Sequence, residues 1–226
     1  EFTNSEKLTY GIFAPWAFYR KDFQEIGGHD PLYAPQSKED SDIFNRFQLN
    51  GIKFIQTWEG FVYHMTCRGS RRNTLDKAKN IYEDSPEWLA QNQKSTRNFI
   101  RKWGITIPTF NELYYWEDEI FNYPTFNMGI ELRSDKHLYK LEPYFDKLYL
   151  GGTAPTEYIA NEQPNTNYDL RSKFLLCDVV DVMIIETELM NEEDLHIINK
   201  IRLSIPHYDV GEYQIGNLKI IIKKKV

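Results

Sequence analysis

The sequence predicts an α/β fold followed by a smaller α+β module, and three observations lead to this class. Apolar, strand-like segments and helical patterns follow one another between residues 11 and 104, as is typical of α/β proteins. A stretch at 105–125, rich in acidic residues and interrupted by proline, then has the character of a connector. Beyond it, strand and helix patterns alternate again, and we expect a compact α+β module, with a ferredoxin-like arrangement as one candidate.

Composition narrows the classes of function. Of the 226 residues 41% are hydrophobic, which is enough for a real core, and the net charge of −6 argues against nucleic acid as a general partner. No apolar run approaches the roughly 18 residues of a membrane span, and no leader-like segment opens the chain. We therefore expect a cytoplasmic protein without a membrane span, and a homo-oligomer is compatible with the sequence. Because the chain begins without Met, we also expect it to be a fragment.

The first elements can be placed from their apolar spacing and their glycines. Residues 11–19 are apolar and aromatic and predict a buried, strand-like segment. A short helix over 21–26 should end at Gly27 and Gly28, because glycine adopts the left-handed conformation cheaply. Short strands are expected at 52–58 and 61–64.

A second helix should begin near Ser37 and end at Gly51. Ser37 has the side chain of an N-cap, and Asp40 stands three residues later, where a capping box places its acid. Ile43, Phe44 and Phe47 then share one face.

The remaining elements follow the same logic. A helical pattern over 74–103 breaks at Ser85-Pro86, a helix-start signature, and stops at Gly104. In the module, strands are expected at 126–132, 178–189 and 218–222. Helices are expected at 135–141, where Pro143 must end or kink the helix, and from Asn191 onward, with Leu195, Ile198 and Ile205 directed inward. The domains are therefore 1–104, a connector at 105–125, and 126–226.

The stretch from Gly11 to Arg72 carries the functional signal. Its sequence Glu39-Asp40-x-Asp42-Ile43-Phe44-Asn45-Arg46 resembles the acidic helix start of the β-1,4-galactosyltransferases, and Ile26-Gly27-Gly28-His29-Asp30 resembles their "GGFd" loop. The resemblance is to the C-terminal, acceptor-side half of family 2 and family 7 glycosyltransferases of the GT-A fold, and it covers roughly the first third of the chain.

The resemblance implies catalytic roles for the acidic residues. An inverting transferase must deprotonate an acceptor hydroxyl, and a carboxylate at a helix start beside the sugar can do so. By resemblance Asp40 is this general base, Glu39 assists it, and Asp42, Gly28 and Trp16 contact a carbohydrate-type acceptor. The alternative is that Asp40 is only the capping-box acid of Ser37, and both roles could coexist. Asp40-Ser41-Asp42 spells D-x-D, but the metal-binding D-x-D ends an apolar strand, whereas this one opens a helix.

His64 is the second anchor of the resemblance. It follows an apolar segment as the family's C-terminal metal ligand does, and a neutral imidazole suits Mn²⁺ or Mg²⁺ whose other ligands come from D-x-D and the donor diphosphate. Three basic residues downstream could neutralise that diphosphate, or could simply form a solvated loop: Arg68, Arg71 and Arg72.

Two departures from the family limit what carries over. The Trp-rich segment that precedes the acidic pair in the galactosyltransferases is replaced by residues 33–38, so acceptor and sugar identity do not follow. The nucleotide-binding half with its own D-x-D is not in these residues. The sequence thus predicts a metal-dependent transferase that uses a nucleotide-sugar donor, without its donor half and inactive in isolation. The alternative is a non-catalytic carbohydrate-binding or assembly module.

Overall fold

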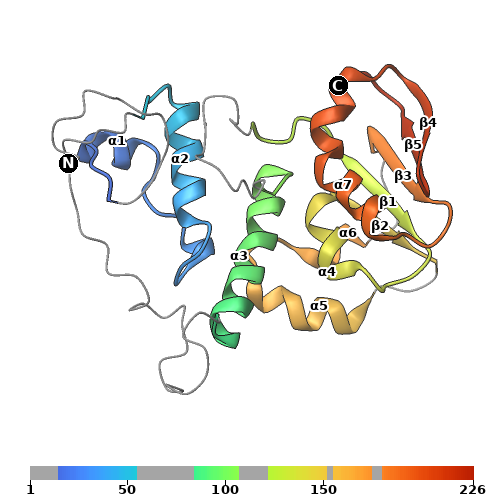
Figure 1. Ribbon diagram of the computed structural model, residues 1–226, viewed down its shortest axis with the longest axis horizontal. Coiled ribbons are helices and arrows are strands. Elements are labelled where there is room, and N and C mark those ends of the chain that lie inside the picture. The colour runs from blue at the N-terminus through green and yellow to red at the C-terminus, as the bar shows by residue number, and fades with distance from the viewer. Residues whose placement is uncertain (1–14, 55–83, 107–121, 152–154, 175–179) are drawn as a thin grey trace, which may run out of the picture. The chain divides into compact units, whose positions relative to one another are not determined.

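The computed structural model describes residues 15–54, 84–106, 122–151, 155–174 and 180–226. The chain divides into two compact units: residues 1–95 with 108–122, and residues 96–107 with 123–226 (Figure 1). Among the described helices, none is both long enough and apolar enough to span a bilayer.

The first unit is built around one amphipathic helix. Its described elements are α1 (Arg20–Glu25), the 3-10 turn η1 (Pro31–Tyr33), α2 (Glu39–Leu49) and the first part of α3 (Pro86–Trp103). Ile43, Phe44 and Phe47 of α2 are buried, as their spacing predicts, and aromatic rings from flanking segments pack on them. Burial of this apolar stripe holds the unit together.

Glycines end both helices of this unit as expected. Gly27 and Gly28 follow α1 with φ of +84° and +73°, and Gly51 follows α2 with φ of +76°. A side chain in this left-handed region would be strained, so these positions favour glycine.

The expected capping box at the start of α2 is wrong. The N-cap is Lys38, with φ of +71°, and no side chain caps the helix there. The hydroxyl of Ser37 instead donates to Oδ1 of Asn92 at 2.6 Å. Asp40 lies in the first turn of α2 as predicted, but it has no capping partner in Ser37.

The predicted buried strand at 11–19 is also wrong for the residues that the structure describes. Residues 15–19 form no strand, and all except the half-buried Trp16 are exposed. Of the strands expected at 52–58 and 61–64, only residues 52–54 are described, and they are not in a strand.

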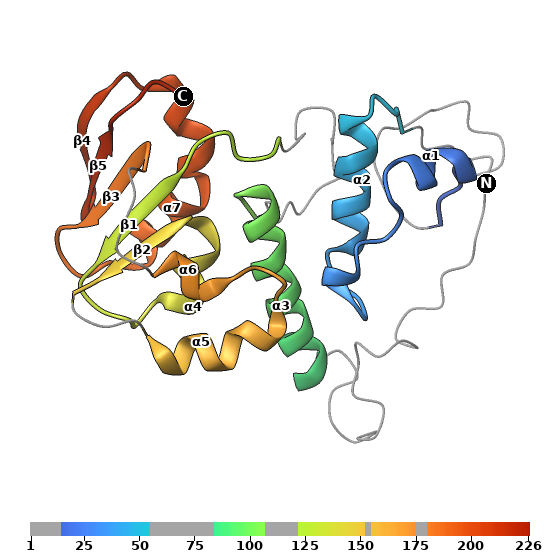
Figure 2. The same cartoon turned by 180° about the vertical axis from the view of Figure 1, so that it is seen from behind.

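The second unit is a mixed five-stranded sheet with helices on one face. The strand order is β2-β1-β3-β5-β4, in which β1 pairs in parallel with β2 and β3, while β5 is antiparallel to β3 and β4. The strands are β1 (Met128–Leu132), β2 (Lys147–Leu150), β3 (Val182–Glu186), β4 (Gly211–Ile215) and β5 (Leu218–Ile222). Figures 1 and 2, which view the unit from opposite sides, both show α7 against one face of this sheet.

Helical segments connect these strands and cover one face of the sheet. They are α4 (Leu138–Leu141), η3 (Glu142–Tyr144), α5 (Thr156–Glu162), η4 (Gln163–Asn165), α6 (Leu170–Lys173), α7 (Glu192–Ser204) and η5 (Ile205–His207). Alternate residues of β3 and β5 are buried, and they share one core with α4, α5, α6, α7 and Ile100 of α3. The described part of the chain thus combines helices with a mixed sheet, in agreement with the general α/β class, but this sheet lies in the unit for which an α+β module was predicted. It has three parallel strands, so it departs from the βαββαβ order of the ferredoxin-like expectation.

Local sequence signals correctly predicted the start of α7 and the bounds of β5. Asn191 caps α7 and forms a full capping box with Asp194, and β5 has the predicted bounds. The helix expected at 135–141 is shortened to α4, which passes into the 3-10 turn that contains Pro143. The strand expected at 178–189 is only Val182–Glu186 among the described residues.

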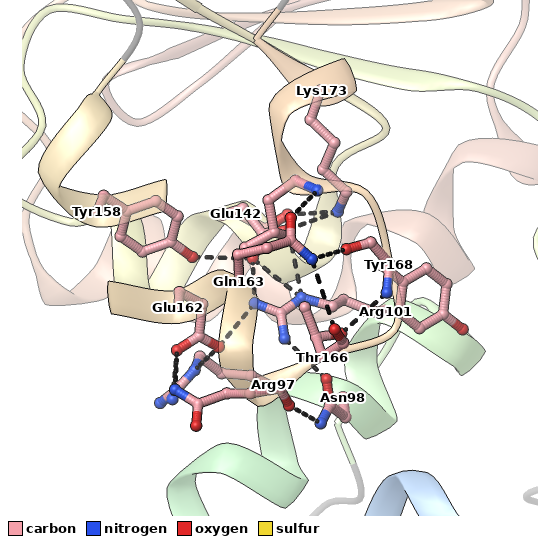
Figure 3. Close-up of polar contacts among 12 residues, drawn as sticks. Arg97, Asn98, Arg101, Glu142, Tyr158, Glu162, Gln163, Thr166, Tyr168 and Lys173 are labelled. Atoms are coloured by element: carbon pink, nitrogen blue, oxygen red, sulfur yellow. Dashed lines mark hydrogen bonds and ion pairs between the residues drawn. The ribbon is translucent and has the colours of Figure 1, made fainter. Parts of the chain in front are cut away.

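A buried ion network joins α3 to the helical layer of the second unit (Figure 3). The side chains of Arg101 and Glu142 are fully buried, and Nη2 of Arg101 lies 2.5 Å from Oε2 of Glu142. Lys173 of α6 pairs with Oε1 of Glu142 at 2.6 Å, and the hydroxyl of Tyr158 donates to Oε2 at 2.9 Å. Arg101 also donates to Glu162 at 2.9 Å.

Favourable pairing keeps this buried carboxylate ionised. Burial alone would raise the pKa of Glu142, but the charges of Lys173 and Arg101 outweigh it and hold that pKa at about 2. Removal of one partner from such a network leaves a buried charge uncompensated, which is costly.

The division between the units falls inside α3. Residues 96–106 belong with the sheet, because Ile100 enters its core and Arg101 enters the ion network. The sequence places the boundary in the connector at 105–125, of which residues 107–121 lie outside the described part of the chain. The second unit therefore includes the last turns of a helix that the sequence assigns to the first.

Replacement of Glu142 should show how much the ion network contributes to the free energy of unfolding. The pKa of Glu142 is lower in the folded protein than in the unfolded chain. Its carboxylate therefore stabilises the fold at pH values above the pKa of an ordinary glutamate, and this stabilisation is lost as the pH falls toward about 2. We expect Glu142→Gln to cost about 3–5 kcal/mol at pH 7, since Lys173 loses this carboxylate and Arg101 retains only that of Glu162, and the cost should shrink below pH 4. Denaturant unfolding at several pH values measures this. The matched control is Glu192→Gln, because Glu192 forms an exposed pair with Lys140 and its loss should leave unfolding unchanged.

The division inside α3 also predicts which fragment folds. A chain of residues 84–226 retains Arg101 and Ile100 and should show a cooperative thermal transition and dispersed amide resonances. A chain of residues 126–226 lacks both and should not. Equal cooperativity of the two fragments would mean that the end of α3 contributes little to this unit.

Candidate functional site

Two adjacent carboxylates open α2. Glu39 and Asp40 are the first two residues of the helix, where Glu39 is partly buried and Asp40 is exposed. Oε2 of Glu39 is buried and has no hydrogen-bond partner among the described residues. A buried carboxylate oxygen without a partner is costly, so this is an unusual place for an acid that only shapes the fold.

The surroundings favour the protonated form of both acids. Loss of water raises the pKa of Glu39, and the neighbouring charge of Asp40 adds to the rise, while backbone amides of Glu39 and Ser37 and the charge of His29 oppose it. Loss of water likewise raises the pKa of Asp40 against the charge of His29. A helix N-terminus by itself favours ionised acids, so partial desolvation is the stronger effect here.

The loop before the acidic pair has a strained backbone and is held by α3. Ser37 and Lys38 both have positive φ, of +79° and +71°, which non-glycine residues seldom adopt. The side-chain amide of Gln91 donates to the carbonyl of Gln36 at 2.9 Å, and the hydroxyl of Ser37 donates to Asn92. These contacts, all within the first unit, hold the loop that leads into Glu39.

An aromatic group in the same unit includes His29. The ring of Trp16 stacks on Phe18 with centroids 4.7 Å apart and meets Phe44 edge-on at 5.2 Å. The imidazole of His29 lies edge-on to Trp16 at 6.4 Å and to Phe23 at 5.4 Å. His29 is exposed, so its imidazole is accessible beside an aromatic surface.

Asp42 and Gly28 were expected to contact an acceptor, but both form hydrogen bonds with Arg46 of the same unit. The carboxylate of Asp42 is fully buried and accepts from Nε of Arg46 at 2.9 Å. Nη2 of Arg46 donates to the carbonyl of Gly28 at 2.7 Å. Direct contact with an acceptor would require Asp42 to leave this pair, so the structure gives it an internal role in place of the expected one.

The predicted metal and diphosphate residues lie outside the described part of the chain. These are His64, Arg68, Arg71 and Arg72. Within the described residues, no group of three or more His, Cys, Asp or Glu side chains is arranged to hold a metal ion.

Two residues of this region were not assigned from the sequence. His29 stands where the galactosyltransferase loop that residues 26–30 resemble has Phe. This difference was the sequence signal that could have drawn attention to His29. Arg46 stands four residues after Asp42, and an acid followed by a base at this spacing predicts a pair on one helix face.

Comparisons with known proteins add no further candidate. A scan against protein-family models returned no match, and searches of curated proteins and of solved structures likewise returned none. A function must therefore be inferred from the side chains around Glu39 and Asp40.

The raised pKa values make a prediction about stability. Because Glu39 and Asp40 bind protons more tightly in the folded chain, their ionised forms oppose folding at neutral pH. We expect Glu39→Gln and Asp40→Asn to raise Tm at pH 7 by roughly 1–3 °C, and the gain should disappear as pH falls below about 4, where the carboxyls of the unfolded chain are also protonated.

The control for this prediction has the opposite sign. Asp42→Asn breaks the buried pair with Arg46 and should lower stability by about 3 kcal/mol at pH 7. If Glu39→Gln and Asp40→Asn also lower Tm at pH 7, the two acids are structural.

Proposed function

We propose that the first unit is the acceptor side of an inverting glycosyltransferase in which Asp40 is the general base. The observation that carries the proposal is the acidic pair at the start of α2. Among the described residues neither a capping box nor an ion pair accounts for Glu39 and Asp40, and both have raised pKa values at a helix start that would otherwise favour their charge. Groups tuned in this way are concentrated at functional sites.

The proposed chemistry is proton removal from an acceptor hydroxyl. As the hydroxyl oxygen attacks the anomeric carbon of the donor sugar, its proton passes to a carboxylate oxygen of Asp40, and the nucleoside diphosphate leaves with the bonding electrons. A base is most effective when its pKa lies near the working pH, and a pKa raised above the ordinary aspartate range moves Asp40 in that direction. Glu39 beside it would hold the proton or orient the hydroxyl.

The acceptor in this proposal is carbohydrate. Trp16 is half-buried and lies in an aromatic group with the exposed Phe18, and such rings offer an apolar surface on which the face of a sugar can rest. The nucleotide-sugar donor, a Mn²⁺ or Mg²⁺ ion bound in part by His64, and diphosphate contacts from Arg68, Arg71 and Arg72 belong to the same proposal through the resemblance. The donor-binding half that the family requires must be supplied for activity.

Loss of the base should abolish most of the turnover. In the chain joined to a nucleotide-binding half, Asp40→Asn is expected to lower kcat on the order of 10²-fold or more, because the amide cannot accept the proton. Transfer from a panel of nucleotide sugars to mono- and oligosaccharide acceptors is measured by release of the nucleoside diphosphate, and the melting temperature is measured in parallel.

A matched control is available in α3. Glu87 occupies the second position of α3, as Asp40 does in α2, and it is exposed, so Glu87→Gln should leave kcat unchanged. Near-normal turnover of Asp40→Asn would overturn the assignment of the base. Wild-type protein that binds oligosaccharide but transfers no sugar would favour the binding-module alternative.

A further inference from the structure

Arg46 makes a set of contacts that link the acidic helix to the turn before it. Its Nε and Nη2 bind Oδ2 of Asp42 at 2.9 and 2.8 Å. Its Nη1 donates to the carbonyl of Ile26, and its Nη2 donates to the carbonyl of Gly28 at 2.7 Å. The Arg46 side chain is only 12% exposed and that of Asp42 is fully buried, so water competes little with these bonds.

The turn that Arg46 binds is closed by two backbone hydrogen bonds, from the amide of Gly27 to the carbonyl of Gln24 at 3.1 Å and from the amide of Gly28 to the carbonyl of Phe23 at 2.9 Å. Gly27 and Gly28 both adopt positive φ and carry no side chains. A Cβ at Gly27 would meet nothing within 4 Å, and one at Gly28 would touch only Phe23. The two carbonyls that Arg46 engages, of Ile26 and Gly28, flank Gly27, and His29 follows directly.

Spacing on α2 places Glu39, the first residue of the acidic pair, on the same face as Arg46. Glu39, Asp42 and Arg46 are separated by three and four residues, so their side chains follow one stripe of the helix. The turn bound by Arg46 is therefore held against the stripe that begins at Glu39. The charge of His29 acts on both Glu39 and Asp40, and it lowers the pKa of each against the effect of lost water.

We propose that Arg46 is a positioning residue: by binding Asp42 and the two carbonyls that flank Gly27, it fixes the His29 turn beside the acidic pair and so sets the surroundings in which Asp40 works. The inference rests on the proposed function for its catalytic consequence, but the positioning itself is a property of this chain. A planar guanidinium has donors on three nitrogens and can bind a carboxylate and two carbonyls together, whereas an ammonium cannot match this geometry.

The decisive variant is Arg46→Lys, which keeps the charge opposite Asp42 and gives up the planar fork. In the 226-residue chain, titration of the Glu39 and Asp40 carboxyls by ¹³C NMR should shift in this variant, because the His29 turn is released, while the melting temperature stays within a few degrees of wild type. Arg20→Lys is the control, since Arg20 is an exposed arginine of the same unit, and it should leave the titration unchanged.

Kinetics of the chain joined to a donor-binding half test the catalytic consequence. Arg46→Lys should lower kcat on the order of 10- to 10²-fold with little change in KM, and should displace the acidic limb of the pH–rate profile. Unchanged carboxyl titration together with an unchanged pH profile would overturn the inference, whatever happens to Tm. An inactive wild-type enzyme would overturn the proposed function, and the NMR titration would then decide the positioning role alone.

Discussion

The second unit depends on the neutralisation of one buried carboxylate. Glu142 lies in the 3-10 turn between α4 and β2, and its charge is compensated by Arg101 from α3 and Lys173 from α6. Ionised groups enter a protein interior only when partners replace the lost water. The 3-10 turn, α3 and α6 are therefore held together by ion pairs as well as by apolar packing. The sheet and α7 complete a core that these segments cover.

In the acidic pair of the first unit, the surroundings change the carboxyl pKa in the opposite direction. Glu142 is fully buried and amply paired, whereas Glu39 is less buried but has an oxygen without a partner among the described residues. The first arrangement lowers a carboxyl pKa, and the second raises it. Acids with raised pKa values and incomplete hydrogen bonding are found more often at functional sites than elsewhere.

Local rules predicted the elements that local chemistry determines. The capping box of Asn191 and the glycines after α1, α2 and α3 act within a few residues, so the sequence reveals them. The cap assigned to Ser37 failed because its hydroxyl finds Asn92, 55 residues away. For the same reason the ion network could not be predicted, since Arg101 and Glu162 are separated by 61 residues. At the candidate site, Asp40 was placed correctly in the first turn of α2, but the internal role of Asp42 depends on burial that the sequence does not display.

The second unit also lacked signals for several of its elements. β2, β4 and the short helices α5 and α6 have mixed burial and few residues, so their hydrophobic periodicity is weak. The parallel pairing of β1 with β2 and β3 follows from the crossovers between them. Without those elements, the sequence predicted an α+β module here but not the strand order or the parallel pairing.

The wide separation of the network's members has a consequence for synthesis of the chain on the ribosome. At about 5–20 residues per second, Glu162 emerges roughly 3–12 s after Arg101. Glu142 emerges earlier, 41 residues after Arg101, and until then the second half of α3 has neither of these carboxylates. Water can solvate Arg97, Asn98 and Arg101 until the carboxylates arrive, but Ile100 of the same segment also waits for the apolar core in which it is finally buried. Completion of the second unit therefore removes an apolar side chain and a charged one from water together, when the segments that carry Glu142 and Glu162 reach the end of α3.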